Sequence, residues 1–181
     1  MHRFGNHASV PDPEARVMRI HQLLPSLEYG DAVAHQAIAI RDRLRGEGHL
    51  SDLFALDRHP RSAATTRSVV ELAGEEGAVT IYHHAYWSED LEAVMRQLPG
   101  RLVLVYHNVT PAEFLRPYGE ALGATVAQAR RVLSELLPRV DVPLAVSPFN
   151  ARELQALGYR NVGLLPLVID ARPFEETTPS A

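Results

Sequence analysis

Short, continuously apolar runs alternate along this chain with longer segments of helical periodicity, and this alternation constrains the fold more than any other feature. The clearest run, LVLVY at 102–106, has no polar break. A strand that is buried on both faces has such a run, whereas a strand with one face in water alternates between apolar and polar residues. Segment 31–48 instead repeats apolar residues at helical spacing, as at Val33, Ala37 and Ile40. The alternation predicts one Rossmann-like α/β domain, with a doubly wound, mainly parallel sheet and helices on both faces.

The expected elements follow from these patterns and from helix-capping residues. We expect strands at 17–24, 50–56, 78–82, 102–106, 142–146 and 162–165, and helices at 31–48, 66–73 and 147–158. Ser88 and Ser147 are typical N-caps, and Thr125 with Gln128 is typical of a capping box, which would begin another helix. The domain is expected to span 16–170, between a flexible arm at 1–15 and a linker or disordered tail at 171–181.

Composition excludes several classes of protein. The 181 residues suffice for one domain, and 46% hydrophobic with 22% charged residues is ordinary for a soluble globular protein. The chain has no cysteine, which excludes disulfides and thiolate chemistry. A net charge of −4 without a basic, aromatic-interleaved stripe predicts no nucleic-acid partner. The longest apolar stretch, 162–169, is broken by Pro166 and is too short to cross a bilayer. We expect a cytoplasmic protein, and peripheral contact with the inner face of the membrane stays open.

Polar residues follow several of the expected strands. Ligands of parallel sheets bind beyond the carboxyl ends of the strands, so these residues are the candidates for a site. They are Gly30 and Asp31, His83 and His84, His107 and Asn108, and Ser147. Their convergence on one edge is the main argument from the residues themselves for a functional site.

The first of these loops, PSLEYGD at 25–31, contains neither GxGxxG nor GxxxxGK[ST]. A dinucleotide-binding or P-loop site is therefore not expected. The helix that begins after Gly30 could still bind a phosphate or a sugar hydroxyl through its first N–H groups. In the alternative interpretation, Gly30 permits the turn and Asp31 caps the helix.

The pair His83–His84 stands at a strand end, so the two side chains are expected to point to opposite faces of the sheet. At most one of them then faces the crevice, and the other packs in the interior. The chain has nine histidines but neither an HxH nor an HExxH arrangement, so no metal site is expected.

His107 is the candidate catalytic residue, because a histidine can orient or deprotonate a hydroxyl near neutral pH. Asn108 could hold a sugar hydroxyl, or cap the turn in which Thr110 and Pro111 begin a short helix. The candidate substrate-binding residues at these two strand ends are His83, His84, Asn108 and Thr110.

Ser147 is better explained as an N-cap than as a nucleophile, since no GxSxG motif surrounds it. It stays a candidate for substrate binding, together with Asn150 in the first turn of the same helix, which faces either the cleft or solvent.

Three stretches of the chain resemble the N-terminal domain of family 4 glycosyltransferases. They are IHQLLPSLEYGDAVAHQAIAIRDRLRGEGH at 20–49, YHNVTPAEFLRPY at 106–118 and SPFNARELQALGYRNVGLLPLVID at 147–170. The segment YHHAYWSE at 82–89 is similar to the part of that family that often carries a histidine at a strand end. The resemblance runs from about 17 to 170.

The resemblance implies one half of a GT-B enzyme, in which two Rossmann-like domains enclose the active site. Such enzymes transfer a sugar from a nucleotide-sugar donor to an acceptor hydroxyl with retention of configuration, without a bound metal or further cofactor. By this match Gly30 and Asp31 lie near the donor phosphate or the acceptor, His107 at the reacting centre, and His83 in the acceptor pocket.

This chain departs from the family pattern in two ways. The C-terminal domain that binds the nucleotide sugar has no counterpart within these 181 residues. The loop EYGD also lacks the family's more common double glycine. We therefore expect an acceptor-binding half of a hexosyltransferase that is inactive without a donor domain. Its expected partners are a sugar or glycoconjugate acceptor and either a separate donor-domain chain or a second copy of this chain.

Two other functions stay open at the level of sequence. One is a non-catalytic module that binds a sugar or docks on a partner. The other is an unrelated nucleotide-dependent oxidoreductase, which the missing glycine fingerprint disfavours.

Overall fold

The computed structural model describes residues 16–28, 30–61, 63–73 and 75–168. The expected arm at 1–15 and tail at 171–181 lie outside the described residues, as does Tyr29.

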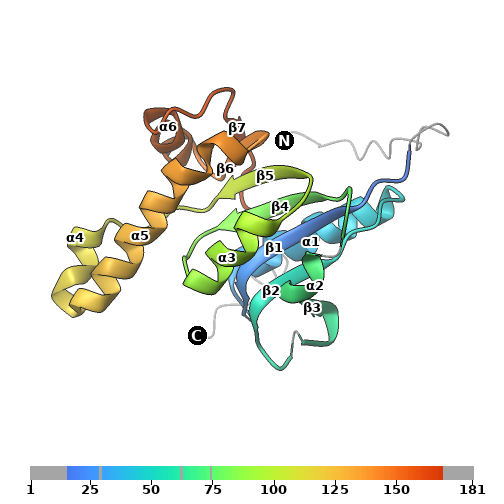
Figure 1. Ribbon diagram of the computed structural model, residues 1–181, viewed down its shortest axis with the longest axis horizontal. Helices are drawn as coiled ribbons and strands as arrows, with labels where there is room; N and C mark the ends of the chain where they lie inside the picture. Colours follow the sequence, from blue (N-terminus) through green and yellow to red (C-terminus); the bar gives the residue numbers. More distant parts are fainter. Residues whose placement is uncertain (1–15, 29, 62, 74, 169–181) are drawn as a thin grey trace, which may run out of the picture.

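The domain is built on one seven-stranded sheet in the order β3-β2-β1-β4-β5-β6-β7, in which every neighbouring pair is parallel (Figure 1). The strands are β1 (Ile20–Leu27), β2 (Leu53–Arg58), β3 (Thr66–Ser68), β4 (Val79–His84), β5 (Arg101–Tyr106), β6 (Val142–Ala145) and β7 (Gly163–Leu164). The α-helices are α1 (Ala32–Gly46), α2 (Val69–Leu72), α3 (Glu89–Gln97), α4 (Ala112–Leu115), α5 (Glu120–Leu136) and α6 (Pro148–Ala156). Short 3₁₀ turns are η1 (Ala63–Thr65), η2 (Arg116–Tyr118) and η3 (Leu137–Arg139). The predicted Rossmann-like, doubly wound α/β class is confirmed.

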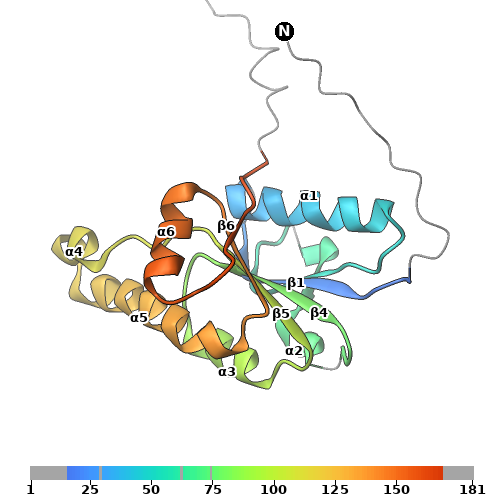
Figure 2. The same ribbon diagram turned by 90° about the horizontal axis from the view of Figure 1, so that it is seen from above.

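The two faces of the sheet are covered unequally. One face, hereafter the α1 face, packs Leu24 and Ala55 against Ala34 and Ala37 of α1. The opposite face carries the main core, in which residues of β1, β2, β4 and β5 meet α3, α5 and α6. Figure 2 shows α1 on one side of the sheet and α3 and α5 on the other. Successive residues of a strand therefore enter different environments, and adjacent side chains of one strand can serve different purposes.

Two of the expected helix starts are confirmed. The Ser88 side chain accepts a hydrogen bond from the N–H of Leu91, and the Ser147 side chain accepts one from the N–H of Asn150. Both are the N-cap geometry that leaves fewer backbone donors unpaired at a helix terminus. The expected end of the last helix is also confirmed, since α6 ends just before Gly158, which has a φ of +98°.

Two local predictions were wrong. Residues 66–73 were expected to be all helix, but Thr66–Ser68 forms β3 beside β2, and only Val69–Leu72 is helical. Thr125 does not cap a helix: α5 begins at Glu120, and the Thr125 hydroxyl donates to the carbonyl of Ala121 inside it. The sequence before Thr125 is compatible with a helix, and tertiary contacts extended the helix through it.

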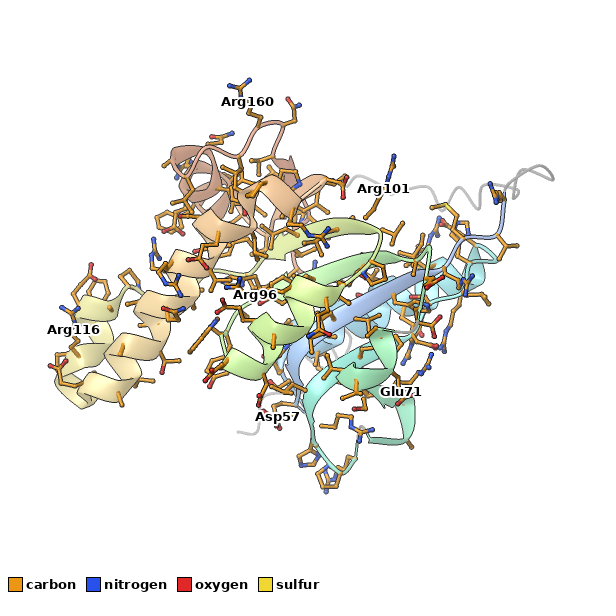
Figure 3. All side chains as sticks on the ribbon, in the orientation of Figure 1. Asp57, Glu71, Arg96, Arg101, Arg116 and Arg160 are labelled. Carbon is orange, nitrogen blue, oxygen red and sulfur yellow. The ribbon has the colours of Figure 1, made fainter. Side chains whose placement is uncertain are left out.

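α4, η2 and the first turns of α5 form a hairpin that extends beyond the sheet (Figure 1). The close approach of η2 to α5 requires a glycine at 123, because a Cβ there would lie 2.4 Å from Cγ of Arg116. Arg116 lies at the outer end of this hairpin (Figure 3). No helix in the described part of the chain is long and apolar enough to cross a membrane.

Candidate functional site

The carboxyl ends of the parallel strands bring the predicted site residues to one edge of the sheet. Gly30 and Asp31 follow β1, His83 and His84 end β4, His107 and Asn108 follow β5, and Ser147 and Asn150 follow β6. Within this edge the structure divides them into a connected group on the α1 face and others with separate roles.

The connected group is a hydrogen-bond relay that runs from α1 across two strands. The Gln22 Nε2 donates to the carbonyl oxygen of Ala37 over 2.9 Å, and the Gln22 Oε1 lies 2.9 Å from the His83 Nε2. The His83 Nδ1 in turn lies 2.9 Å from the His107 Nε2. Gln22 and His83 have no exposed surface, so the relay is shielded from water up to its last member.

This relay fixes which ring nitrogens carry protons. A backbone carbonyl only accepts, so Gln22 must turn its NH₂ group to Ala37 and its Oε1 to His83. The Oε1 only accepts, so the His83 Nε2 carries a proton and its Nδ1 accepts from the His107 Nε2–H. The neutral His107 ring then has an unprotonated Nδ1. This buried atom has no hydrogen-bond partner among the described residues.

Burial keeps both histidines of the relay neutral. Desolvation and, to a smaller extent, the neighbouring His107 lower the pKa of His83 to about 3. Desolvation also lowers the pKa of His107, to about 4, against the opposing effect of the Asp31 carboxylate. At neutral pH the free His107 Nδ1 is therefore a hydrogen-bond acceptor, suited to a hydroxyl group of a ligand.

His84 lies on the other face of the sheet and is saturated there. Its Nε2 donates to the carbonyl of Ala129 in α5 over 3.0 Å, and its Nδ1 accepts from the Tyr82 hydroxyl over 2.9 Å. Its ring has no exposed surface, and burial lowers its pKa to about 4. The expected division of the pair is confirmed: His84 is the packed member, so the structure assigns its ring to the core and not to a ligand.

Gly30 and Asp31 lie where α1 begins. The Asp31 carboxylate accepts from the N–H of Ala34 over 3.1 Å, so the capping interpretation is confirmed. The Asp31 carboxylate also raises the pKa of His107, against the larger effect of burial. Gly30 has a φ of +85°, a conformation that an L side chain rarely adopts, and open space beside its Cα. Gly30 thus lies beside the positive end of the α1 dipole, and its contact with a ligand stays a prediction.

Asn108 and Thr110 belong to the turn that follows His107. Asn108 has a φ of +83°, so the backbone is left-handed directly after the histidine. Asn108 and Thr110 are exposed, whereas Val109 between them is buried. Both exposed side chains are accessible to a ligand, and their role in substrate binding stays a prediction.

Ser147 and Asn150 form the first turn of α6. Ser147 accepts from the N–H of Asn150, and its hydroxyl donates to the Asn150 Oδ1. Asn150 is 4% exposed, and its buried Nδ2 has no hydrogen-bond partner among the described residues. A buried donor without a partner costs free energy unless something binds it, so Asn150 is a candidate contact for a ligand.

Sequence reasoning missed two glutamines. Gln22 completes the relay, and the buried Gln36 of α1 donates to the carbonyls of Leu165 and Pro166 over 3.3 and 3.2 Å. The Gln36 amide thus ties α1 to the segment through which the chain leaves the sheet. The signal for both was an amide in an otherwise apolar stretch, since a buried amide needs partners.

One hollow among the described residues lies away from the site edge. A hollow of about 550 Å³ between α3 and α5 is lined by Trp87, Leu91 and Met95, among others, and not by His83 or His107. Among the described residues, no three acidic or histidine side chains are grouped so that they could hold a metal ion. The prediction that the protein uses no metal is not tested by this arrangement.

Neither a family model nor a curated protein matches this sequence. Solved structures do match the fold. One is an α-glucosyltransferase in complex with UDP and a 13-mer DNA containing an HMU base, at 14% identity and a TM-score of 0.56, covering 86% of this chain and 44% of that chain. A second, an α-glucosyltransferase with UDP-glucose and DNA containing an abasic site, gives 16% identity and a TM-score of 0.57, covering 92% and 47%. A third, an α-glucosyltransferase in complex with UDP, gives 16% identity and a TM-score of 0.51, covering 84% and 42%.

At these identities the likeness shows a fold shared with glycosyltransferases, and this chain spans less than half the length of those proteins. Two of those proteins were solved with DNA, and the absence of a nucleic-acid partner stays a prediction for this chain.

Proposed function

We propose that this chain is the acceptor-binding half of a retaining glycosyltransferase, which moves a sugar from a nucleotide-sugar donor to an acceptor hydroxyl together with a donor-binding domain. The observation that carries the proposal is the unpartnered Nδ1 of His107, held at the carboxyl edge of the sheet by His83. The fold shared with α-glucosyltransferases solved with UDP or UDP-glucose supports it, and so does the fraction of those chains that this one covers.

The proposed role of His107 follows from its protonation state. Its Nε2–H donates to the His83 Nδ1. Because its pKa is about 4, the ring is neutral at neutral pH and has no second proton to donate. His107 would instead accept a hydrogen bond from a sugar hydroxyl and so orient the sugar. The Asn150 Nδ2 would donate to an oxygen of the ligand, which supplies the opposite kind of hydrogen bond.

A donor domain is needed because transfer leaves negative charge on the departing nucleotide phosphate. Stabilising such charge requires donors aimed at the phosphate oxygens in the transition state. The α1 N-terminus offers one positive dipole end, but the Asp31 carboxylate caps it. We therefore expect no turnover by this chain alone.

The test measures UDP release and sugar transfer from UDP-glucose and related donors. The purified chain is assayed alone and with a separately produced donor domain, with saccharides and DNA offered as acceptors. The proposal expects transfer only in the mixture, and expects His107→Ala to lower it about tenfold, the loss of one orienting hydrogen bond, without loss of folding. His35→Ala, an exposed histidine of α1, is the matched control and should leave the rate unchanged.

Two outcomes would contradict the proposal. Tight binding of a nucleotide sugar by this chain alone would assign it the donor role. Saccharide binding without transfer, in the presence of a competent donor domain, would make it a non-catalytic binding module.

A further inference from the structure

Three side chains that sequence reasoning did not single out fix the backbone that follows His107. They are Tyr106 at the end of β5, Arg130 in α5 and Glu153 in α6, and we refer to them as the loop clamp. All three come from different elements, and each contacts at least one of the others or the backbone of Val109.

The loop clamp satisfies both backbone groups of Val109. The N–H of Val109 donates to the Tyr106 Oη over 3.2 Å, and the Arg130 Nη1 donates to the carbonyl of Val109 over 2.7 Å. The Tyr106 hydroxyl donates to the Glu153 Oε2 over 3.1 Å, and the Arg130 Nη2 donates to the Glu153 Oε1. Glu153 thus uses one carboxylate oxygen for each arm of the clamp, a bridging geometry that a planar carboxylate allows.

Charge and burial make this arrangement specific. The Glu153 side chain is 18% exposed and Tyr106 has no exposed surface. Burial, with the Glu153 carboxylate nearby, raises the pKa of Tyr106 to about 12, so its hydroxyl stays protonated and can donate. Hydrogen bonds between charged groups in such surroundings are stronger than neutral ones.

The clamp acts on the residues that directly follow His107. The N–H of His107 is still bonded to the carbonyl of His84, as a continuation of the strand pairing. One residue later Asn108 is left-handed, with a φ of +83°, a conformation that is uncommon outside glycine. Fixing Val109 on the far side of Asn108 therefore fixes the direction in which the chain leaves His107.

We propose that Glu153, acting through Tyr106 and Arg130, is a positioning residue that holds the turn at 107–110 and keeps the His107 ring in its buried place beside His83. The catalytic meaning of this positioning rests on the proposed glycosyltransferase function. The positioning itself does not, because it can be measured in the chain without any substrate.

The test uses NMR on the full chain, in the wild type and in Glu153→Gln. Loss of the carboxylate should loosen the turn, so amide exchange at Val109 should quicken about tenfold or more relative to the core strand amide of Leu104. The His107 ring should become better hydrated, and its pKa should rise by about one unit or more toward 6.5. Tyr106→Phe, which removes only the hydroxyl, is a second variant and should act in the same direction.

Glu135→Gln is the matched control. Glu135 lies at the surface of α5 and pairs with Arg131, the residue next to Arg130 of the clamp. It should change neither the Val109 exchange ratio nor the His107 titration. The inference is overturned if Glu153→Gln and Tyr106→Phe lower stability globally while both local readouts stay at wild-type values.

The failure of the proposed function would look different. In that case the clamp variants would still release Val109 and shift the His107 titration, but no donor domain would restore sugar transfer to any variant or to the wild type.

Discussion

His83 and His84 are neighbours in one strand, and they belong to two hydrogen-bond systems of different kinds on the two faces of the sheet. On the main core face, His84 lies between the Tyr82 hydroxyl and the carbonyl of Ala129, so both ring nitrogens are used. On the α1 face, His83 bonds Gln22 and His107, and the last nitrogen of that system, the His107 Nδ1, has no partner among the described residues.

The difference teaches how to separate a structural histidine from a candidate for function. Burial alone does not do so, because both His83 and His84 are fully buried and have lowered pKa values. The criterion is whether the hydrogen-bond system closes within the protein. A closed system stabilises the fold, whereas one that ends in an unpaired atom at a sheet edge is a candidate for binding a ligand.

The largest expected effect is on the pH dependence of stability, to which both systems contribute. The pKa values of His83, His84 and His107 lie at about 3 to 4 in the folded chain, against an ordinary value of 6.5. The unfolded chain therefore binds more protons below pH 6.5, and stability that is complete above this pH falls as the pH drops toward 4. Each histidine contributes a slope of up to about 1.4 kcal/mol per pH unit. Urea unfolding between pH 4.5 and 7.5 measures it, and an unfolding free energy independent of pH would contradict the buried neutral state.

Next in size is the effect of His83→Leu, which opens the system on the α1 face. It leaves the Gln22 Oε1 and the His107 Nε2–H without their partner, and we expect a loss of about 3 kcal/mol of unfolding free energy. The His107 ring should also lose its fixed tautomer, which its nitrogen chemical shifts report. Unchanged His107 shifts in a folded His83→Leu protein would show that the relay does not set the tautomer.

A smaller effect is expected from His84→Leu, which opens the closed system. The Tyr82 hydroxyl is left buried and unpaired, at a cost of about 2 kcal/mol in denaturant unfolding. Adding Tyr82→Phe removes the unpaired hydroxyl and should recover most of the lost unfolding free energy. The His107 nitrogen shifts should not move in either variant. If they do, the two systems are coupled through the strand and the comparison between them fails.

Ser147→Ala should have the smallest effect. Removing the N-cap of α6 should cost about 1 kcal/mol of stability. The variant also removes the hydroxyl that donates to the Asn150 Oδ1, so it tests whether Ser147 contributes to ligand binding as well as to the helix cap. Unaltered ligand affinity at a lowered melting temperature supports a cap, and a large loss of affinity would place Ser147 in the binding site.

The sequence predicted the fold well because apolar strands and helix caps are local signals. The run 102–106 is buried in the sheet, and Ser88 and Ser147 cap helices as their side chains allow. Where a local signal competed with tertiary contacts it failed, as at 66–73 and at Thr125. A three-residue edge strand has too short a pattern to be told from a helical turn, and Thr125 is ambiguous between a cap and a helix interior.

The site was predictable only as a set of candidates. Polar residues after the strands identified the correct edge, because parallel strands end together. Which of His83 and His84 faced that edge was not predictable, since a shift of one residue exchanges the two faces. Gln22 was overlooked because its partners, Ala37 and His83, lie 15 and 61 residues away in sequence.

By itself the sequence determined the α/β class, the alternation of the main strands and helices, and the histidines available at one edge, since these depend on residue type and spacing. Only the tertiary structure decided that the His107 Nδ1 is left without a partner, that His84 belongs to the core, and that Arg130 and Glu153 hold the turn at 107–110. Those outcomes depend on which hydrogen-bonding groups from distant segments reach one another, and residue spacing alone does not contain that information.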